Sequence, residues 1–275
     1  MPSRRTRLAT AVVFAAFAAL ALAGCAGESS ASDYVTEGKL TIATSQPAYP
    51  PYVLDNAPQS GKGFEAAVAY AVADKLGFAE KDVVWTRVDF DKAIAPGPKD
   101  FDLNLQQYSI TDARKKKVDF SSPYFEAPQA VVALAGSRAA AATGIAGLRS
   151  ALLGVQTGTT SLTAIQTEIE PTQQPQVFNT NSDAVAALKS KQVDAIVVDL
   201  PTAFYLTSAE LEDGTIVGQL ADSGAGGEEW GILLPKGSAL TAKVSKAVDA
   251  LRADGTLAAL QDEWLGGSAG APVLR

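Results

Sequence analysis

The chain has 275 residues, of which 47% are hydrophobic and 19% charged, a balance typical of a globular protein. Its formal net charge of −7 gives no electrostatic basis for binding nucleic acid. It contains no histidine and a single cysteine, Cys25, which excludes Ser-His-Asp and Cys-His catalysis, the commonest zinc-ligand sets and an intrachain disulfide. We expect neither a metal nor a cofactor.

Residues 1–24 are predicted to be a signal peptide. Three arginines precede a continuous run of small and apolar residues at 8–22, which is too short for a comfortable membrane span. The run ends in Leu-Ala-Gly before Cys25, and this end looks like a bacterial lipobox. The resemblance implies cleavage before Cys25 and a lipid on its sulfur; the alternative is an ordinary secretory signal. Residues 25–37 are small and polar and predict a flexible tether.

The folded part is predicted to begin with a strand over 39–45, where apolar and polar residues alternate. Three prolines in the following segment, 46–52, forbid a helix and stiffen a loop. This loop carries Tyr49 and Tyr52 at the carboxyl end of a strand, where ligands bind in open α/β sheets. The alternative is a packed surface loop whose tyrosines cap the core.

Apolar residues at helical spacing predict a helix over 64–76, which ends at Gly77. Strands are expected at 82–89 and 101–105, and Pro96-Gly97-Pro98 interrupts a short helical piece between them. Because strands and helices alternate, the sequence predicts a parallel, doubly wound sheet.

Polar residues gather just after the 101–105 strand. Gln106 and Gln107 stand at its carboxyl end, and Thr111 is a good helix N-cap. Arg114 falls in the first turn of that helix, where free N–H groups and a guanidinium together suit a carboxylate. The lysines at 115–117 are expected to be surface residues, and a Ser-Pro-Tyr turn follows them.

Beyond a buried-type strand at 129–136, a second strand-helix series begins at Leu152. Strands are expected at 129–136, 153–156, 177–178, 193–198, 215–220 and 229–234, and helices at 160–170, 182–189, 201 onward, 238–254 and 256–264. Asp199 ends the 193–198 strand as a second charged group at a strand terminus. Since Pro201 fits the first turn of the next helix, the alternative role of Asp199 is a helix cap.

The two series predict two α/β lobes. Lobe 1 is expected to span 38–133 and 234–266, and lobe 2 to span 137–228. The crossovers at 134–136 and 229–233 would form a two-segment hinge. Residues 267–275 are expected to be a tail.

Several segments, in this order, resemble the polar amino-acid family (family 3) of solute-binding proteins of ABC transporters. They are AYPPY (48–52), GFEAAVA (63–69), SITDAR (109–114), VDFSSPYF (118–125), GVQTGTTS (154–161), VDAIVVD (193–199) and LRADGTLAALQDEWLG (251–266). The resemblance implies a bilobed periplasmic-binding-protein fold of type II, with two doubly wound mixed sheets.

The resemblance also implies roles for individual residues. Tyr49 and Phe90 match aromatics that stack on the ligand. Ser109 and Arg114 match groups that hold its α-carboxylate, and Thr159 and Thr160 match contacts from the second lobe to the same carboxylate. Asp199 matches the partner of the ligand's ammonium group. Two departures from the family pattern are Gln106 and Gln107, which would fill the pocket or read a polar side chain. Gln46, where some relatives carry an acid, argues mildly against a cationic ligand side chain.

The expected function is therefore that of a lipid-anchored, monomeric receptor outside the cytoplasm, which binds an amino acid and delivers it to an ABC permease. A second possibility is a dehydratase-like enzyme on the same fold, with Glu228 or Glu229 as general acid. A third is a sensor ectodomain, for which no membrane-spanning segment follows Trp264.

Overall fold

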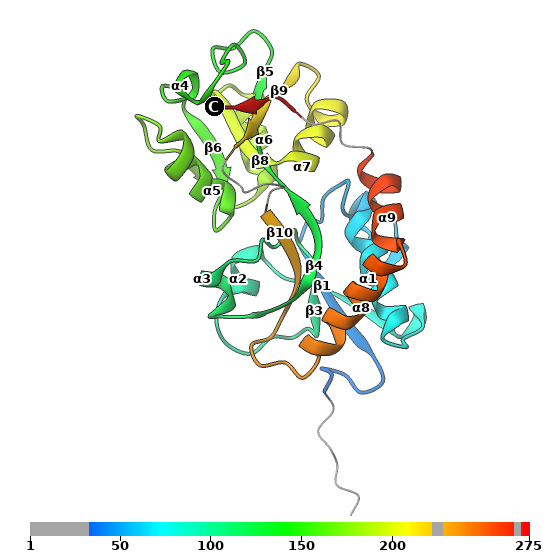
Figure 1. Ribbon diagram of the computed structural model, residues 1–275. Coiled ribbons are helices and arrows are strands. Elements are labelled where there is room, and N and C mark those ends of the chain that lie inside the picture. The colour runs from blue at the N-terminus through cyan, green and yellow to red at the C-terminus, as the bar shows by residue number, and fades with distance from the viewer. Residues whose placement is uncertain (1–32, 222–227, 267–270) are drawn as a thin grey trace, which may run out of the picture. The chain divides into compact units, whose positions relative to one another are not determined.

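The computed structural model describes residues 33–221, 228–266 and 271–275 (Figure 1). The predicted signal peptide, Cys25 and the first part of the tether lie outside these residues. Within the described ranges, no helix is both long enough and apolar enough to cross a membrane. The expected α/β class with two mixed sheets is confirmed.

The sheet of lobe 1 has five strands in the order β2-β1-β3-β10-β4. Their bounds are β1 Leu40–Thr44, β2 Val83–Arg87, β3 Leu103–Asn104, β4 Asp119–Ala127 and β10 Glu228–Leu234. Strand β1 pairs in parallel with β2 and β3, as the alternation of strands and helices predicted. Strand β10 returns from lobe 2 and pairs antiparallel with β3 and β4, which makes the sheet mixed.

The three long helices of lobe 1, α1, α8 and α9, pack against one another through apolar side chains. They lie side by side in Figure 1. The helices are α1 Phe64–Lys75, α2 Phe90–Ile94, α3 Asp112–Lys115, α8 Thr241–Ala253 and α9 Thr256–Leu265, with 3-10 turns at Leu54–Asn56, Pro58–Ser60 and Glu80–Asp82. Phe64 of α1 and Trp230 of β10 are fully buried in this core. The core holds the carboxyl ends of β1 and β3 in place.

The sheet of lobe 2 has six strands in the order β11-β9-β5-β8-β6-β7. Their bounds are β5 Gln129–Leu134, β6 Leu153–Gln156, β7 Gln176–Phe178, β8 Ala195–Asp199, β9 Gly214–Leu220 and β11 Val273–Leu274. The helices are α4 Ile145–Leu148, α5 Thr160–Ala164, α6 Asn181–Lys189 and α7 Leu200–Tyr205, with π-helical turns at Ile165–Ile169 and Leu206–Glu210. Apolar residues on β5 and β8 are buried on both faces of this sheet.

The Ser-Pro-Tyr segment is a strand, which corrects the predicted turn. Strand β4 runs without interruption through Pro123. It lies at the edge of its sheet, and its register with β10 shifts beside Pro123. An edge position and a bulge are the places where a strand tolerates proline, because no ladder hydrogen bond is lost there.

The connections between lobes also differ from the expected ones. Strand β5, expected in lobe 1, pairs with β8 and β9 of lobe 2, so the chain changes sheets at Pro128 and not at 134–136. Strand β10 belongs to the first sheet, so the return crossing lies between Leu220 and Glu228 and not at 229–233. A rotation of the lobes about these crossings remains a prediction.

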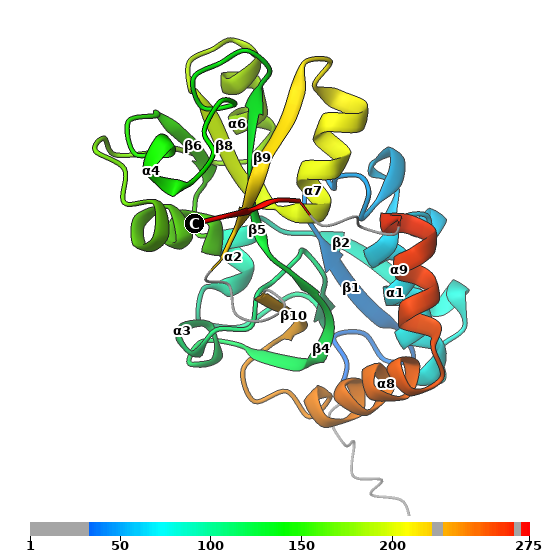
Figure 2. The same ribbon diagram turned by 45° about the horizontal axis from the view of Figure 1, so that its top comes forward.

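The C-terminal residues are not a free tail. Val273 and Leu274 of β11 pair in parallel with Gln219 and Leu220 of β9. Leu274 is 2% exposed, and the carbonyl oxygen of Arg275 accepts a hydrogen bond from the Ile145 backbone N–H. Figure 2 shows β11 beside β9. Because α9 packs on α1 and α8 of lobe 1, the chain connects the lobes a third time between Leu265 and Val273.

The last part of the predicted tether is ordered against lobe 1. The ring of Tyr34 packs edge-on against Phe78, with centroids 5.1 Å apart. The Val35 N–H donates to Oδ1 of the buried Asp102 at 2.8 Å. The tether expected over 25–37 is therefore part of the fold from Tyr34 onward.

Candidate functional site

A cavity of about 500 Å³ receives residues from the carboxyl ends of strands in both sheets. Its lining residues are Ser45, Gln46, Pro47, Tyr49, Asp89, Phe90, Asp91, Lys92, Gln106, Gln107, Ser109, Arg114, Gln156, Thr157, Thr159, Thr160, Ser161, Asn179, Thr180, Asn181 and Asp199. The volume suits a small molecule. Every residue expected to contact a ligand lines this cavity except Tyr52, although contact with a ligand remains a prediction.

Tyr52 belongs to the core and does not line the cavity. Its side chain is 2% exposed and packs at 68° against Trp230, with ring centroids 5.6 Å apart. Its hydroxyl lies 2.9 Å from Thr202 Oγ1 of α7, a bond between the two lobes. The alternative interpretation, a loop tyrosine that caps the core, is therefore correct for Tyr52, while Tyr49 reaches the cavity.

Arg114 is held by backbone carbonyl groups from both lobes. Thr111 caps α3 by accepting from the Arg114 N–H, as predicted, and this fixes the start of the arginine side chain. Nη1 donates to Ser109 O at 2.7 Å, and Nη2 donates to Gly158 O at 3.1 Å. Burial lowers the pKa of the guanidinium, and the Glu228 carboxylate opposes that shift. The guanidinium thus stays in a fixed plane against the cavity.

The Phe90 ring forms part of the surroundings of Arg114. Its centroid lies 5.4 Å from the guanidinium carbon, within reach of a cation–π contact. The ring also stacks on the buried Tyr108, with centroids 4.7 Å apart. Since Tyr108 holds the ring in place, Phe90 provides a rigid apolar wall.

Gly158 is required where the lobes approach each other. Its φ of +69° lies in the left-handed region. A Cβ atom at this position would stand only 1.8 Å from Oδ1 of Asp91, a residue of α2 in lobe 1. The Thr157-Gly158 turn can therefore carry no side chain at its second position without moving Asp91.

Asp199 is oriented by a chain of hydrogen bonds. Its Oδ1 accepts from Gln129 Nε2 at 2.7 Å, and Gln129 Oε1 accepts from Ser161 Oγ at 2.6 Å. Its side chain makes no cap hydrogen bond to α7, so the helix-cap alternative is not what the structure shows. Burial, with a further contribution from the negative charge of Glu228, raises the pKa of Asp199 to about 7.

The two glutamines after β3 are held by different partners. Gln106 is 2% exposed, and its Nε2 donates to Val88 O and Asn104 Oδ1. Gln107 adopts a φ of +52°, and both its backbone N–H and its side-chain amide donate to the carboxylate of Glu65. Glu65 is 1% exposed and also accepts from Tyr124 Oη. This buried carboxylate therefore supports an unusual backbone conformation at the cavity.

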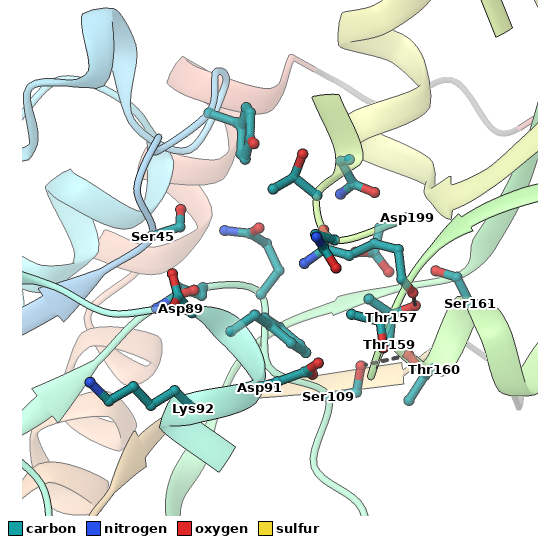
Figure 3. A pocket seen from close by; sticks show the side chains of 18 of the residues that line it. Ser45, Asp89, Asp91, Lys92, Ser109, Thr157, Thr159, Thr160, Ser161 and Asp199 are labelled. Carbon is teal, nitrogen blue, oxygen red and sulfur yellow. Dashed lines mark hydrogen bonds between the residues drawn. The ribbon is translucent and has the colours of Figure 1, made fainter. Parts of the chain in front are cut away.

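Ser109 and Thr160, from different lobes, lie next to each other in the lining of the cavity. Their hydroxyl oxygens lie 3.1 Å apart, and Figure 3 shows the two side chains facing each other. Both hydroxyls donate to Oε2 of Glu228. Thr159, by contrast, caps α5 by accepting from the Leu162 N–H and donates to Gln156 O. Its hydroxyl hydrogen is therefore already committed within its own lobe.

Several of the residues that form or support the cavity were not predicted from the sequence. Those that line it are Ser45, Pro47, Asp89, Asp91, Lys92, Gln156, Thr157, Ser161, Asn179, Thr180 and Asn181, and those that support it are Glu65 and Gln129. Asp89 and Asp91 flank Phe90, so proximity to an expected site residue could have indicated them. In Figure 3 they stand with Lys92 on the lobe 1 side of the cavity.

The arrangement offers opposite charges at separate points of one cavity. Arg114 of lobe 1 supplies N–H donors, and Asp199 of lobe 2 supplies a carboxylate. A small zwitterion matches this pair. The described residues contain no group of three or more histidine, cysteine or acidic side chains placed to hold a metal ion. Neither Glu228 nor Glu229, the general acids considered for an enzyme, is among the lining residues.

Comparison with known proteins identifies the family. The model of the bacterial extracellular solute-binding proteins, family 3, matches residues 40–267. The L-arginine-binding protein of Pseudomonas aeruginosa is 31% identical over 223 residues, which cover 79% of this chain and 84% of that protein.

Two solved structures are similar to this one. An ancestral arginine-binding protein bound to glutamine has a TM-score of 0.71 at 33% identity, covering 84% of this chain and 99% of that one. The ancestral amino acid-binding protein AncCDT-1, a precursor of cyclohexadienyl dehydratase, has a TM-score of 0.68 at 28% identity, covering 83% of this chain and 95% of that one. The predicted bilobed type II periplasmic-binding-protein fold is thereby confirmed, and the chain belongs to family 3 of the bacterial extracellular solute-binding proteins.

Proposed function

We propose that the protein binds an L-amino acid between its lobes, as a monomer. The observation that carries this proposal is the presence of Arg114 and Asp199, from different lobes, in one cavity of about 500 Å³. Arg114 would hold the α-carboxylate, and Asp199 would hold the α-ammonium. Because the two contacts come from different lobes, the ligand stabilises the closed arrangement that makes both.

The rest of the cavity suits a polar side chain. Tyr49 Oη and Gln106 Oε1 are buried without a hydrogen-bond partner among the described residues, so each can take one from a ligand. Asp89, Asp91 and Lys92 add charge, and Phe90 adds an apolar wall. The names of similar proteins mention arginine and glutamine, and these two amino acids are the first to test.

A thermal-shift screen against the standard L-amino acids tests this function. A ligand that binds the folded state raises its melting temperature by mass action, by an amount that grows with ligand concentration. We expect a concentration-dependent rise with one or a few polar amino acids. The dehydratase alternative would act on prephenate-like acids. The absence of any shift with amino acids at millimolar concentrations, together with a shift from prephenate, would favour that alternative.

We also propose that the receptor is lipid-anchored through Cys25 outside the cytoplasm and delivers its ligand to an ABC permease. The lipobox-like end of the signal peptide supports the anchor. Expression of the Cys25→Ala variant should release the protein from the membrane fraction and abolish labelling by a palmitate analogue. Labelling that persists in this variant would contradict the anchor and leave the ligand-binding function untouched.

A further inference from the structure

A half-buried carboxylate joins two hydroxyl groups from different lobes. Ser109 follows β3 in lobe 1, and Thr160 is the first residue of α5 in lobe 2. Both hydroxyls donate to the same oxygen, Oε2 of Glu228, which is the first residue of β10. Ser109 and Thr160 line the cavity, whereas Glu228 is not among its lining residues. The carboxylate therefore contacts the two hydroxyls from outside the cavity.

This arrangement determines which atoms the hydroxyls can offer to a ligand. A hydroxyl group has one hydrogen and two acceptor lone pairs. A carboxylate oxygen is a stronger acceptor than a hydroxyl oxygen, so we assign the hydrogens of both Ser109 and Thr160 to Glu228 and none to the 3.1 Å contact between the two oxygens. Only lone pairs then remain for the cavity. Asp199, which also lines the cavity, is likewise an acceptor. These three groups are therefore acceptors, while Arg114 supplies donors.

We infer that Glu228 is a positioning residue that makes the site select an ammonium group. It does so by holding the hydroxyls of Ser109 and Thr160 as acceptors. An ammonium has three N–H donors for the three acceptors, whereas a hydroxyl at the same place on a ligand has one. A ligand with the hydroxyl would leave buried acceptors unpaired, which is what makes such sites selective. The inference rests on the proposed function and reverses the role expected of the Ser109 hydroxyl, which was to hold the carboxylate.

The test compares each L-amino acid that stabilises the wild-type protein, beginning with L-arginine and L-glutamine, with its 2-hydroxy acid analogue. Calorimetry gives the ratio of the two dissociation constants for each variant. We expect the wild type to favour the amino acid by at least about 100-fold. Glu228→Met removes the acceptor at similar size and frees both hydroxyl hydrogens, so the ratio should fall about tenfold.

Two further variants separate orientation of the hydroxyls from other roles of Glu228. Glu228→Gln keeps an oxygen that can accept both hydroxyls, so its ratio should stay within about threefold of wild type. Glu229→Met makes the same chemical change at the exposed neighbouring carboxylate and should leave the ratio unchanged. If Glu228→Gln lowers the ratio as much as Glu228→Met, the negative charge acts directly and the inference is overturned.

A double-mutant cycle covers the case in which Glu228→Met is merely destabilising. In a background of Ser109→Ala with Thr160→Val there is no hydroxyl to orient, so Glu228→Met should not change the ratio further. A persisting effect there, or an equal loss of affinity for both ligands in the single variant, contradicts the inference while amino-acid binding stands. A wild-type protein that binds no amino acid overturns the proposed function, and this inference with it.

Discussion

Nη2 of Arg114 donates a hydrogen bond of 3.1 Å to the carbonyl oxygen of Gly158, and this bond joins the two lobes. Nη1 of the same side chain donates to Ser109 O at 2.7 Å. A guanidinium has five N–H donors in a rigid plane, so these two bonds set the direction of the remaining donors. The guanidinium that we propose as the carboxylate-binding group is therefore oriented by the protein itself.

Arg114→Ala should weaken binding of the amino acid by at least about 2 kcal/mol, or roughly 30-fold, because a buried charge loses its partner. Arg114→Lys should restore only part of the affinity, since an ammonium cannot donate in a fork. Calorimetry with the ligand from the thermal screen measures both. Lys115→Ala, which removes an exposed cation next to Arg114, serves as the control. Unchanged affinity in Arg114→Ala would contradict the assigned role.

Gly158→Ala should weaken ligand binding although the new methyl group need not touch the ligand. A Cβ atom there would stand 1.8 Å from Asp91 Oδ1, so closure would force Asp91 away. A left-handed φ costs a non-glycine residue about 1–2 kcal/mol in addition. Affinity measured by calorimetry and unfolding measured by denaturant titration distinguish the two effects.

Gly136→Ala is the matched control for the Gly158 substitution. Gly136 has a φ of +77°, close to that of Gly158, but a Cβ atom there meets nothing within 4 Å. Both variants should lose similar stability from backbone strain, and only Gly158→Ala should lose ligand affinity. Equal affinities in the two variants would show that the contact with Asp91 does not matter for closure.

Much of the fold could be predicted from local patterns. The alternation of strands and helices indicated parallel pairing of β1 with β2 and β3, and helix α1 ends close to the predicted Gly77. The pattern failed at Pro123, because a local rule cannot tell an edge strand with a bulge from a turn. It also failed for β11, whose partner β9 lies more than fifty residues earlier in the chain.

Site residues at or near strand ends could be predicted from the sequence. Residues that act by holding another side chain could be predicted much less well. Asp199 ends a strand and Arg114 lies in the helix after one, so both could be named. Tyr49 and Tyr52 share a loop, and only tertiary packing separates them. Glu65 and Glu228 reach the site through contacts with residues far away in sequence. No spacing rule connects such pairs, since the tertiary fold alone brings them together.

Ligand affinity should fall as the medium becomes acidic. The pKa of Asp199 is raised to about 7, first by burial and then by the charge of Glu228. A bound ammonium favours the charged carboxylate, so binding below this pKa must release a proton. The dissociation constant should therefore rise by up to about tenfold per pH unit as the pH falls below about 7.

Asp199→Asn isolates this effect from Glu65, whose pKa is also raised to about 7. The amide oxygen can still accept from Gln129 Nε2, so the local geometry should persist. The variant should bind more weakly and lose the pH dependence. Calorimetry in two buffers with different ionisation enthalpies should show proton release on binding for the wild type alone. A wild-type affinity that is constant between about pH 5 and pH 8 contradicts the role of Asp199.

Glu65 should make the stability of the protein depend on pH. Burial raises its pKa from 4.5 to about 7, against the hydrogen bonds from Tyr124 and Gln107. Because the folded state favours the protonated form of Glu65, this residue contributes its full stabilisation below the unfolded pKa of 4.5. The stabilisation is lost as the pH rises through the folded pKa of about 7. A shift of this size corresponds to about 3 kcal/mol between acid and alkaline conditions.

Glu65→Gln removes this titration with little change in shape. Denaturant unfolding at about pH 5 and about pH 8 should show the variant gaining up to about 3 kcal/mol relative to wild type at the higher pH, because only the wild type must then bury a charge. The gain requires the Gln107 amide to reverse, since its Nε2 now donates to Glu65. Glu80→Gln, at an exposed carboxylate of the same lobe, should show no such gain. A relative stability of Glu65→Gln that is the same at both pH values would mean that Glu65 is already ionised in the folded protein at the lower pH, with its three donors outweighing its burial.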